Sequence, residues 1–114
     1  MTRAEIAAEL DKLGIYYDPD HPDHVSREKL DTLEPPFMEW GTQENTYRAD
    51  GIDYLSWKTL IIRIYSDTNE DVEIITPSGR TVDESLRESF EKFTKQQYYN
   101  DELSLYETNY TTEV

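Results

Sequence analysis

The sequence predicts an α+β domain in which a small, mainly antiparallel sheet carries two helices packed on one face. Two segments place apolar side chains at helical spacing directly behind a capping box. A third segment, residues 52–65, has no proline and is rich in β-branched and aromatic residues, as a strand requires. The length of 114 residues suits one domain, so we expect residues 1–114 to form a single domain with an irregular acidic loop region at residues 15–35.

The first helix is expected at residues 3–13. Thr2 and Glu5 stand at the two capping-box positions, where each side chain accepts a hydrogen bond from the other residue's backbone N–H. Apolar residues follow at helical spacing: Ile6, Leu10 and Leu13. Gly14 suits the end of this helix. Prolines and aspartates then exclude regular structure until residues 26–33, which suit one or two helical turns before a Pro-Pro pair.

The middle of the chain predicts a strand, a turn and a longer strand. Residues 37–41 suit a short strand, and residues 45–51 suit a polar turn that closes on an Asp-Gly pair. The long strand at residues 52–65 has apolar side chains at even positions (Ile52, Tyr54, Leu60, Ile62 and Ile64) and at odd positions (Leu55, Trp57, Ile61 and Tyr65). Because successive side chains alternate between faces, both faces of this strand are apolar. We therefore expect something outside the chain to cover one side of the sheet.

The last third of the chain predicts one more helix and two strands. Residues 72–76 suit a small optional strand, and Thr81 and Glu84 form a second capping box. Behind that box, apolar residues repeat at helical spacing: Val82, Leu86, Phe90 and Phe93. Residues 97–99 suit a short strand, and residues 103–114 suit a final strand. One face of that final strand carries Tyr106, Tyr110 and Val114.

Charge and composition exclude several classes of function. The chain has 11 Lys and Arg against 25 Asp and Glu, a formal net charge of −14, whereas nucleic-acid and anionic-lipid binders depend on clustered cations. The absence of cysteine excludes disulfides, thiol nucleophiles and Cys-ligated zinc, and it fits a reducing cytoplasm. No apolar run is long enough to span a bilayer, so we expect a soluble protein with protein partners.

The sequence offers no catalytic constellation and predicts no enzyme, cofactor or metal. One loop gathers acids with both histidines: Asp18, Asp20, His21, Asp23 and His24. Carboxylates and imidazoles can bind divalent cations, but the spacing and the glycine of an EF-hand loop are missing, so a solvated acidic loop is favoured. Neither a nucleophile elbow nor a phosphate-binding glycine loop occurs among the four glycines.

Apolar residues make up only 36% of the chain, so we expect a thin core. The aromatic residues exceed what such a core needs, and aromatic residues are enriched at protein interfaces. Tyr98 and Tyr99 belong to this aromatic set. The polar loop at residues 45–53 is longer than a simple connection requires, and Arg48 within it suits a carboxylate of a neighbouring copy. An ion pair within the chain is the open alternative for Arg48. The candidate interface residues are Trp40, Tyr47, Arg48, Asp50, Tyr54 and Trp57.

Several segments carry a family resemblance. They are Pro35-Pro36-Phe37, Thr42 to Asn45, Tyr47-Arg48-Ala49-Asp50-Gly51-Ile52-Asp53-Tyr54, Leu60 to Thr68, the second predicted helix, Tyr98-Tyr99, Glu102 to Tyr110, and Glu113-Val114. Across residues 35–114 the chain resembles the tail-terminator and tail-completion proteins of long-tailed bacteriophages, similar to the one in lambda-like phages.

The resemblance implies a small α+β fold and a structural role in the virion. It implies a hexameric ring that caps the tail tube and joins it to the head connector. The implied partners are further copies of the chain, the major tail protein and the head-connector protein. DNA would pass through the lumen without specific binding, and no membrane is involved. The implied location is the virion, at the interface of head and tail, after synthesis in the host cytoplasm.

An excess of acid is consistent with that role, because carboxylates lining a conduit repel the phosphates of passing DNA. Two alternatives stay open at this point. One is an acidic DNA mimic that inhibits a host defence enzyme, although its acids would need to be arrayed along one surface. The other is a different head–tail joining protein, such as a connector stopper or a head-completion factor.

Overall fold

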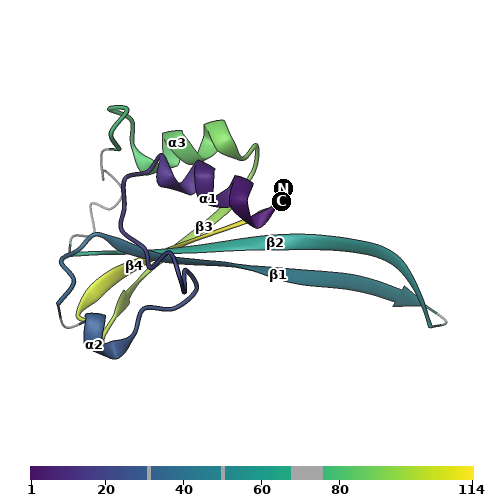
Figure 1. Ribbon diagram of the computed structural model, residues 1–114, viewed down its shortest axis with the longest axis horizontal. Coiled ribbons are helices and arrows are strands. Elements are labelled where there is room, and N and C mark those ends of the chain that lie inside the picture. The colour runs from purple at the N-terminus through teal and green to yellow at the C-terminus, as the bar shows by residue number, and fades with distance from the viewer. Residues whose placement is uncertain (31, 50, 68–75) are drawn as a thin grey trace.

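The computed structural model describes residues 1–30, 32–49, 51–67 and 76–114, without the side chains of residues 27, 28, 49 and 52–55. Three helices and four strands follow one another along the chain: α1 (Arg3–Asp11), α2 (Arg27–Leu30), β1 (Phe37–Ala49), β2 (Ile52–Ser66), α3 (Val82–Ser89), β3 (Thr94–Asn100) and β4 (Leu105–Glu113). The strands form one antiparallel sheet in the order β1-β2-β4-β3. Helices α1 and α3 lie side by side on one face of it (Figure 1), so the predicted α+β class is confirmed.

The N-terminal helix α1 begins and ends as its sequence predicts, within two residues. The capping box is present: the Glu5 N–H donates to Thr2 Oγ1 at 3.2 Å, and the Thr2 N–H donates to Glu5 Oε1 at 3.0 Å. The helix ends at Asp11. Gly14 has a φ of 67°, a backbone conformation that residues with a Cβ rarely adopt. A Cβ at Gly14 would also lie 2.8 Å from the ring of Pro77, so the packing there requires glycine.

Helix α3 buries the stripe expected of it, although the helix is shorter than predicted. Val82, Leu86 and Phe90 are all buried, and Phe90 already has extended backbone, so it caps the helix. Phe93 therefore reaches the core from the segment after the helix, where its ring meets Tyr110 edge-on at 5.3 Å. The larger core lies between these helices and the even-numbered side chains of the sheet, including Met38, Trp40, Leu60, Ile62, Ile64 and Tyr110.

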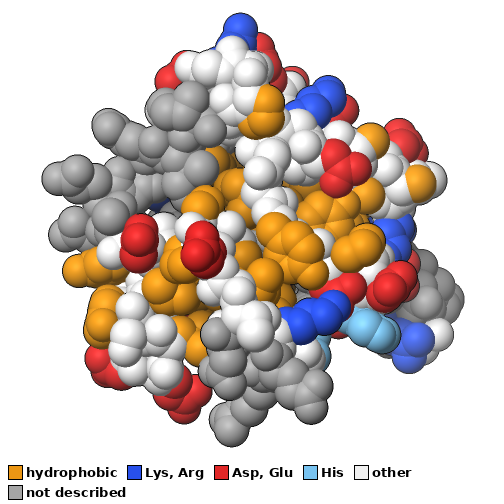
Figure 2. Space-filling model, turned by 60° about the vertical axis from the view of Figure 1, so that its left-hand side comes forward, with side chains coloured by type: hydrophobic (Ala, Val, Ile, Leu, Met, Phe, Trp, Pro, Cys, Tyr) orange, Lys and Arg blue, Asp and Glu red, His pale blue; other side chains and the backbone are white. Residues whose placement is uncertain are grey.

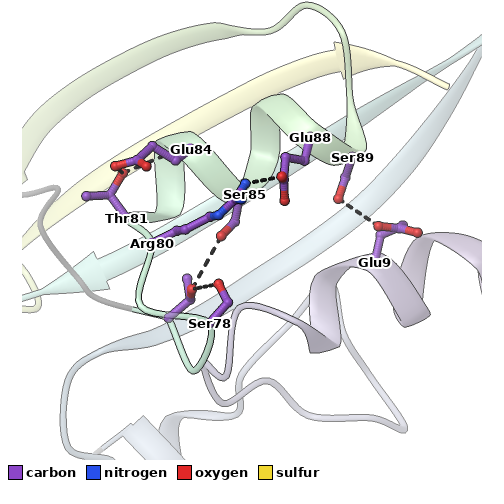
Figure 3. A network of polar contacts seen from close by, with 9 residues as sticks. Glu9, Ser78, Arg80, Thr81, Glu84, Ser85, Glu88 and Ser89 are labelled. Atoms are coloured by element: carbon purple, nitrogen blue, oxygen red, sulfur yellow. Dashed lines mark hydrogen bonds and ion pairs between the residues drawn. The ribbon is translucent and has the colours of Figure 1, made fainter.

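Polar contacts cap α3 and join it to α1 (Figure 3). Thr81 Oγ1 accepts from the Glu84 N–H at 3.2 Å and caps the helix. At the other end of the helix, the Ser89 hydroxyl donates to Glu9 Oε2 at 2.7 Å and so joins α3 to α1. Arg80 forms an ion pair with Glu88 along the outer side of the helix.

The second face of the sheet is partly covered by the chain itself. Phe37 and Tyr65 stack at 5.1 Å on this face and form a small core with Val25. Half-buried leucines pack around that core: Leu30, Leu33, Leu103 and Leu105. The expectation that something outside the chain covers this face was wrong at this end of the sheet. The segment between α1 and β1, with its single turn α2, provides the cover.

The β1–β2 hairpin differs most from the prediction. The expected short strand at residues 37–41 continues to Ala49, and the expected polar turn at 45–51 is strand up to its last two residues. The sequence did not show this, because alternation between apolar and polar residues marks only strands with one buried face. The long strand β2 was predicted to within one residue.

The remaining strands also follow the prediction in outline. Strand β3 is longer than the expected 97–99, and β4 is shorter than the expected 103–114. Tyr110, on the face of the final strand that was expected to carry Tyr106, Tyr110 and Val114, is buried in the larger core. The optional strand was predicted at residues 72–76. Residues 72–75 lie outside the described part of the chain, and only Thr76 of this segment is described.

Candidate functional site

A two-stranded ribbon projects from the body of the molecule. Strand β4 ends opposite Thr59 of β2, and the Val114 N–H donates to the Lys58 carbonyl at 3.0 Å. Beyond that point, residues 44–49 of β1 and 52–58 of β2 pair only with each other among the described residues. We call this ribbon the arm. Seven residues at about 3.4 Å each give it a length of roughly 24 Å, and Figure 1 shows it extending well past the helices.

Local sequence explains why the arm is a ribbon with a tight turn. Gly51 has a φ of 76°, which the two-residue turn of a hairpin favours. The Asn45 side-chain amide donates to Thr59 Oγ1 at 2.9 Å across the two strands. The register shifts between Tyr47 and Arg48, a bulge that increases the local twist of the arm.

Two of the predicted interface residues lie on one face of the arm. Trp57 pairs with Asn45, and Tyr47 pairs with Leu55 two positions further on, so Trp57 and Tyr47 are diagonal neighbours on the same face. The exposed fraction is 58% for Tyr47 and 37% for Trp57. Such large exposed aromatic surfaces on a projecting element are typical of protein contacts.

The other predicted interface residues have different surroundings. Arg48 is exposed on the arm, next to the bulge. Asp50 lies outside the described residues, and so does the side chain of Tyr54. Trp40 is only 3% exposed and lies in the larger core, where Tyr17 meets its ring edge-on at 5.8 Å. Trp40 is therefore not at the surface of the chain, and the argument for a contact surface rests on the arm residues.

The opposite end of the sheet carries an apolar patch that the sequence interpretation missed. Leu103 and Leu105, from the turn between β3 and β4, lie with Leu33 and Leu30 around the small core of Phe37, Tyr65 and Val25. We call these four leucines the end patch. All four are half-buried, and Figure 2 shows hydrophobic side chains gathered toward this end of the molecule. The register of β4, which brings Tyr106 opposite Ser66, places Leu103 and Leu105 at this end of the sheet.

The end patch is bordered by acids. Asp101 and Glu102 are exposed in the same turn, and no Lys or Arg occurs in residues 96–114. The turn has a fixed shape, because the Leu103 N–H donates to Asn100 Oδ1 at 3.1 Å and Ser104 takes a φ of 54°. Exposed acids therefore lie beside Leu103, whereas the exposed Lys29, which pairs with Asp18, stands next to Leu30.

A buried carboxylate lies behind this turn. Glu107 is 4% exposed, accepts a hydrogen bond from the Tyr98 hydroxyl and accepts another from Asn100 Nδ2 at 3.3 Å. Burial alone would raise the pKa of Glu107, but these donors, together with the polar groups of Asn109 and Tyr65, outweigh burial and lower the pKa. The side chain therefore stays ionised and holds β3 to β4.

The described residues hold two groups that resemble catalytic or metal sites. Thr76 Oγ1 lies 2.9 Å from Ser78 Oγ and 3.3 Å from Ser85 Oγ (Figure 3), but among the described residues neither histidine hydrogen-bonds to these hydroxyls. Asp18 accepts from Lys29 Nζ at 2.9 Å and from the Asp20 N–H at 3.0 Å, and the lysine lowers the pKa of its carboxyl. The described residues contain no cluster of three or more potential metal ligands.

An open groove lies beside the last turn of α3, lined among others by Phe90, Phe93, Thr111 and Val114. Its charged side chains are of both signs, Arg87 and Lys92 against Glu91 and Glu113. Such a groove favours no particular charged ligand.

Comparison of the chain with protein-family models, with curated proteins and with solved structures gave no match. No helix in the described parts of the chain has the length and apolar character needed to cross a membrane.

Proposed function

We propose that this chain is a structural assembly protein whose copies join through the arm into a ring. In the role of a phage tail terminator, this ring would cap a tail tube and connect it to the head. The observation that carries the proposal is the arm itself, a ribbon with which no third strand pairs among the described residues and on which Tyr47 and Trp57 are exposed. A two-stranded ribbon in water is marginally stable, and a partner surface would stabilise it.

The class of partner follows from the chemistry of the arm. Aromatic side chains each bury roughly 150–250 Å² when covered, and they dominate the energetics of protein contacts. With 11 cations against 25 acids, the chain as a whole repels nucleic acid. The proposed partners are therefore proteins: further copies of this chain, the major tail protein and the head-connector protein.

The net charge of the chain supports a ring that forms only on a tube end or when salt screens the repulsion between copies. Six copies at −14 each would bring about −84 formal charges together in one ring, so free copies repel one another. Docking on a tube end, or screening by salt, offsets this repulsion. The same acids would let DNA slide through a lumen without sticking, because like charges repel in a narrow channel.

Negative-stain microscopy and sedimentation velocity test the proposal on the purified protein, alone and mixed with tail tubes of a long-tailed phage. We expect monomers in low salt and rings, or capped tubes, when salt or tubes are added. A protein that stays monomeric in every salt concentration and leaves tubes uncapped would contradict the proposal. Rings that bind the isolated head connector but not tubes would indicate a stopper instead.

A matched control removes the arm alone. Replacing residues 44–58 by Asn-Gly leaves Gln43 paired with Thr59 across a two-residue turn, which this dipeptide favours. We expect this shortened variant to keep the circular dichroism of the folded body and to form no rings. Rings formed by the shortened variant would show that the arm is not the contact.

A further inference from the structure

We infer that the outer edge of β3 is a contact surface for a second copy of the chain, whose own β3 pairs with it in the antiparallel direction about a two-fold axis. The pairing would join two four-stranded sheets into one continuous sheet. This inference goes beyond the proposed function, because the contact uses neither the arm nor its aromatic residues. It holds or fails independently of ring formation.

Strand β3 is an open edge of the sheet. It comes last in the strand order β1-β2-β4-β3 and pairs only with β4 among the described residues. No backbone hydrogen bond joins its other side to another described segment, and Thr94 to Tyr99 are all exposed. The backbone N–H and C=O groups along such an edge can pair with a further strand.

The opposite edge of the sheet is protected, whereas β3 is not. In the body, the Met38 N–H of β1 donates to the Tyr16 carbonyl at 2.8 Å. The Trp40 N–H donates to the Pro22 carbonyl at 2.7 Å, so the chain itself covers this edge. In the arm, the bulge of β1 interrupts the edge. Strand β3 contains no proline, and its register with β4 runs without a bulge.

The one charged residue of β3, Lys95, does not stand over the open edge. Lysine on an edge strand often prevents pairing with another chain. Here its Nζ lies 3.3 Å from Asp83 Oδ2 of α3 and 5.8 Å from the centre of the Tyr110 ring. Tyr98 and Tyr99 remain 49% and 48% exposed on opposite faces of the strand. A neighbouring strand would cover part of both rings and add cross-strand pairs.

The charges at the two ends of β3 are opposite in sign. Residues 91–95, where the strand starts, carry two lysines against one glutamate, a net charge of +1. Residues 100–103, where it ends, carry Asp101 and Glu102, a net charge of −2. Two copies of β3 in the antiparallel direction bring each positive end beside a negative end, whereas parallel pairing brings like charges together. Charge complementarity therefore favours a second β3 in the antiparallel direction.

The register follows from pairing the strand along its whole length. All seven residues, Thr94–Asn100, are paired when Gln97 lies opposite its own counterpart on the two-fold axis. Lys92 of each copy then lies opposite Glu102 of the other, and both of these side chains are exposed. A two-fold contact makes this ion pair twice. The Gln97 amide donates to Thr108 Oγ1 at 3.2 Å, and its second N–H and its oxygen suit the facing amide.

Exchange of the charges at the two ends tests this dimer. Lys92→Glu and Glu102→Lys each place like charges opposite one another twice. Both are made in a chain with Tyr47→Ser and Trp57→Ser, which lacks the proposed arm contact, and sedimentation equilibrium at about 0.15 M salt measures dimerisation. We expect each single exchange to weaken dimerisation about tenfold. Both exchanges in one chain, or an equimolar mixture of the two single variants, should restore it, because opposite charges then face each other.

Net charge serves as the control in this experiment. Glu102→Lys changes the net charge of the chain from −14 to −12, so lower overall repulsion alone would strengthen the dimer. The double exchange leaves the net charge at −14, and circular dichroism checks that each variant is folded. A dimer that Glu102→Lys leaves equally strong, or a double exchange no better than the single ones, would overturn the inference.

A cysteine on the two-fold axis gives a second readout in the full chain, which has no cysteine of its own. Residues directly opposite in an antiparallel pair have Cα atoms roughly 4.5–5.5 Å apart, within reach of a disulfide. Gln97→Cys alone is expected to give a disulfide-linked dimer. Thr94→Cys is the matched control and should stay monomeric, because it lies opposite Asn100. Equal linkage of the two variants, or linkage of Gln97→Cys to Thr46→Cys on the arm in preference to itself, would contradict the inference.

The outcomes also separate this inference from the proposed function. A linked Gln97→Cys dimer, in a protein that forms no rings at any salt concentration, would support the β3 contact and contradict the ring. Rings in a protein whose Gln97→Cys variant gives no linked dimer would overturn the β3 contact and leave the arm-mediated ring intact.

Discussion

Glu39 of β1 accepts a hydrogen bond from the Tyr65 hydroxyl of β2 at 2.7 Å, next to the small core of the second face. Its other oxygen accepts from the Val25 N–H at 3.0 Å, so one carboxylate holds both strands and the segment that covers them. Burial raises the pKa of Tyr65 first of all, and the hydrogen bond to Glu39 raises it further. The phenol therefore remains a donor throughout the working pH range.

Removal of that donor is expected to destabilise the body. Tyr65→Phe keeps the ring that stacks on Phe37 but leaves Glu39 with one bond fewer. Hydrogen bonds to charged groups contribute about 1.5–3 kcal/mol, so the free energy of unfolding should fall by roughly that amount in urea titrations. Tyr16→Phe is the control, because Tyr16 is exposed and its contact with Met38 is made by the backbone carbonyl. Equal midpoints for both variants would show that the Glu39–Tyr65 bond contributes nothing.

The apolar stripe of α3 gives a stability prediction for the larger core. Phe90 is 5% exposed, and Phe90→Ala should cost about 3–5 kcal/mol, as is usual for such core truncations. Tyr16→Ala, at an exposed position, serves as the control. A urea midpoint unchanged by Phe90→Ala would mean that the end of α3 does not contribute to the core.

The body of the fold was predictable because its elements have local signals. Capping boxes mark the starts of α1 and α3, and Leu60, Ile62 and Ile64 alternate as a buried strand should. The arm has no such signal, since most residues at 44–49 of β1 are polar and belong to a ribbon that no helix of the described residues covers. Its pairing depends on β2, and a neighbour across a hairpin is not visible in local periodicity.

The candidate surface was predictable only in part for a related reason. Trp57 and Trp40 are the same residue type, and composition alone could not tell the exposed ring from the buried one. The end patch was missed because its leucines come from two distant segments, residues 30–33 and 103–105, which only the tertiary fold brings together.

Acid should weaken the fold through groups whose carboxylates are bonded in the folded state. Burial opposes ionisation of Glu107, yet its hydrogen bonds lower its pKa below the usual 4.5. A lowered pKa stabilises the folded state above pH 4.5, and that contribution is lost as the pH falls through the folded value. Glu107→Gln should therefore show a shallower loss of urea stability below pH 4.5 than the unmodified protein. A parallel pH profile for the two proteins would exclude this role.

Ionic strength should promote association. Each copy carries −14, and the screening length falls from roughly 30 Å at 0.01 M salt to about 10 Å at 0.1 M. Repulsion between whole copies acts over such distances, whereas the proposed contact through the aromatic residues of the arm would not be weakened by screening. Sedimentation should show more rings as salt rises, and rings that dissociate with rising salt would instead indicate a contact dominated by ion pairs.

The two tryptophans provide a matched pair that separates stability from assembly. Trp40 is 3% exposed in the larger core and Trp57 is 37% exposed on the arm. Trp40→Ala should lower the free energy of unfolding by about 3–5 kcal/mol, as large core truncations do. Trp57 belongs to neither hydrophobic core, so the urea midpoint of Trp57→Ala should stay close to that of the unmodified protein while rings and tube capping are lost. If Trp57→Ala instead unfolds the protein as Trp40→Ala does, the ring of Trp57 supports the body, and the contact between copies must lie elsewhere.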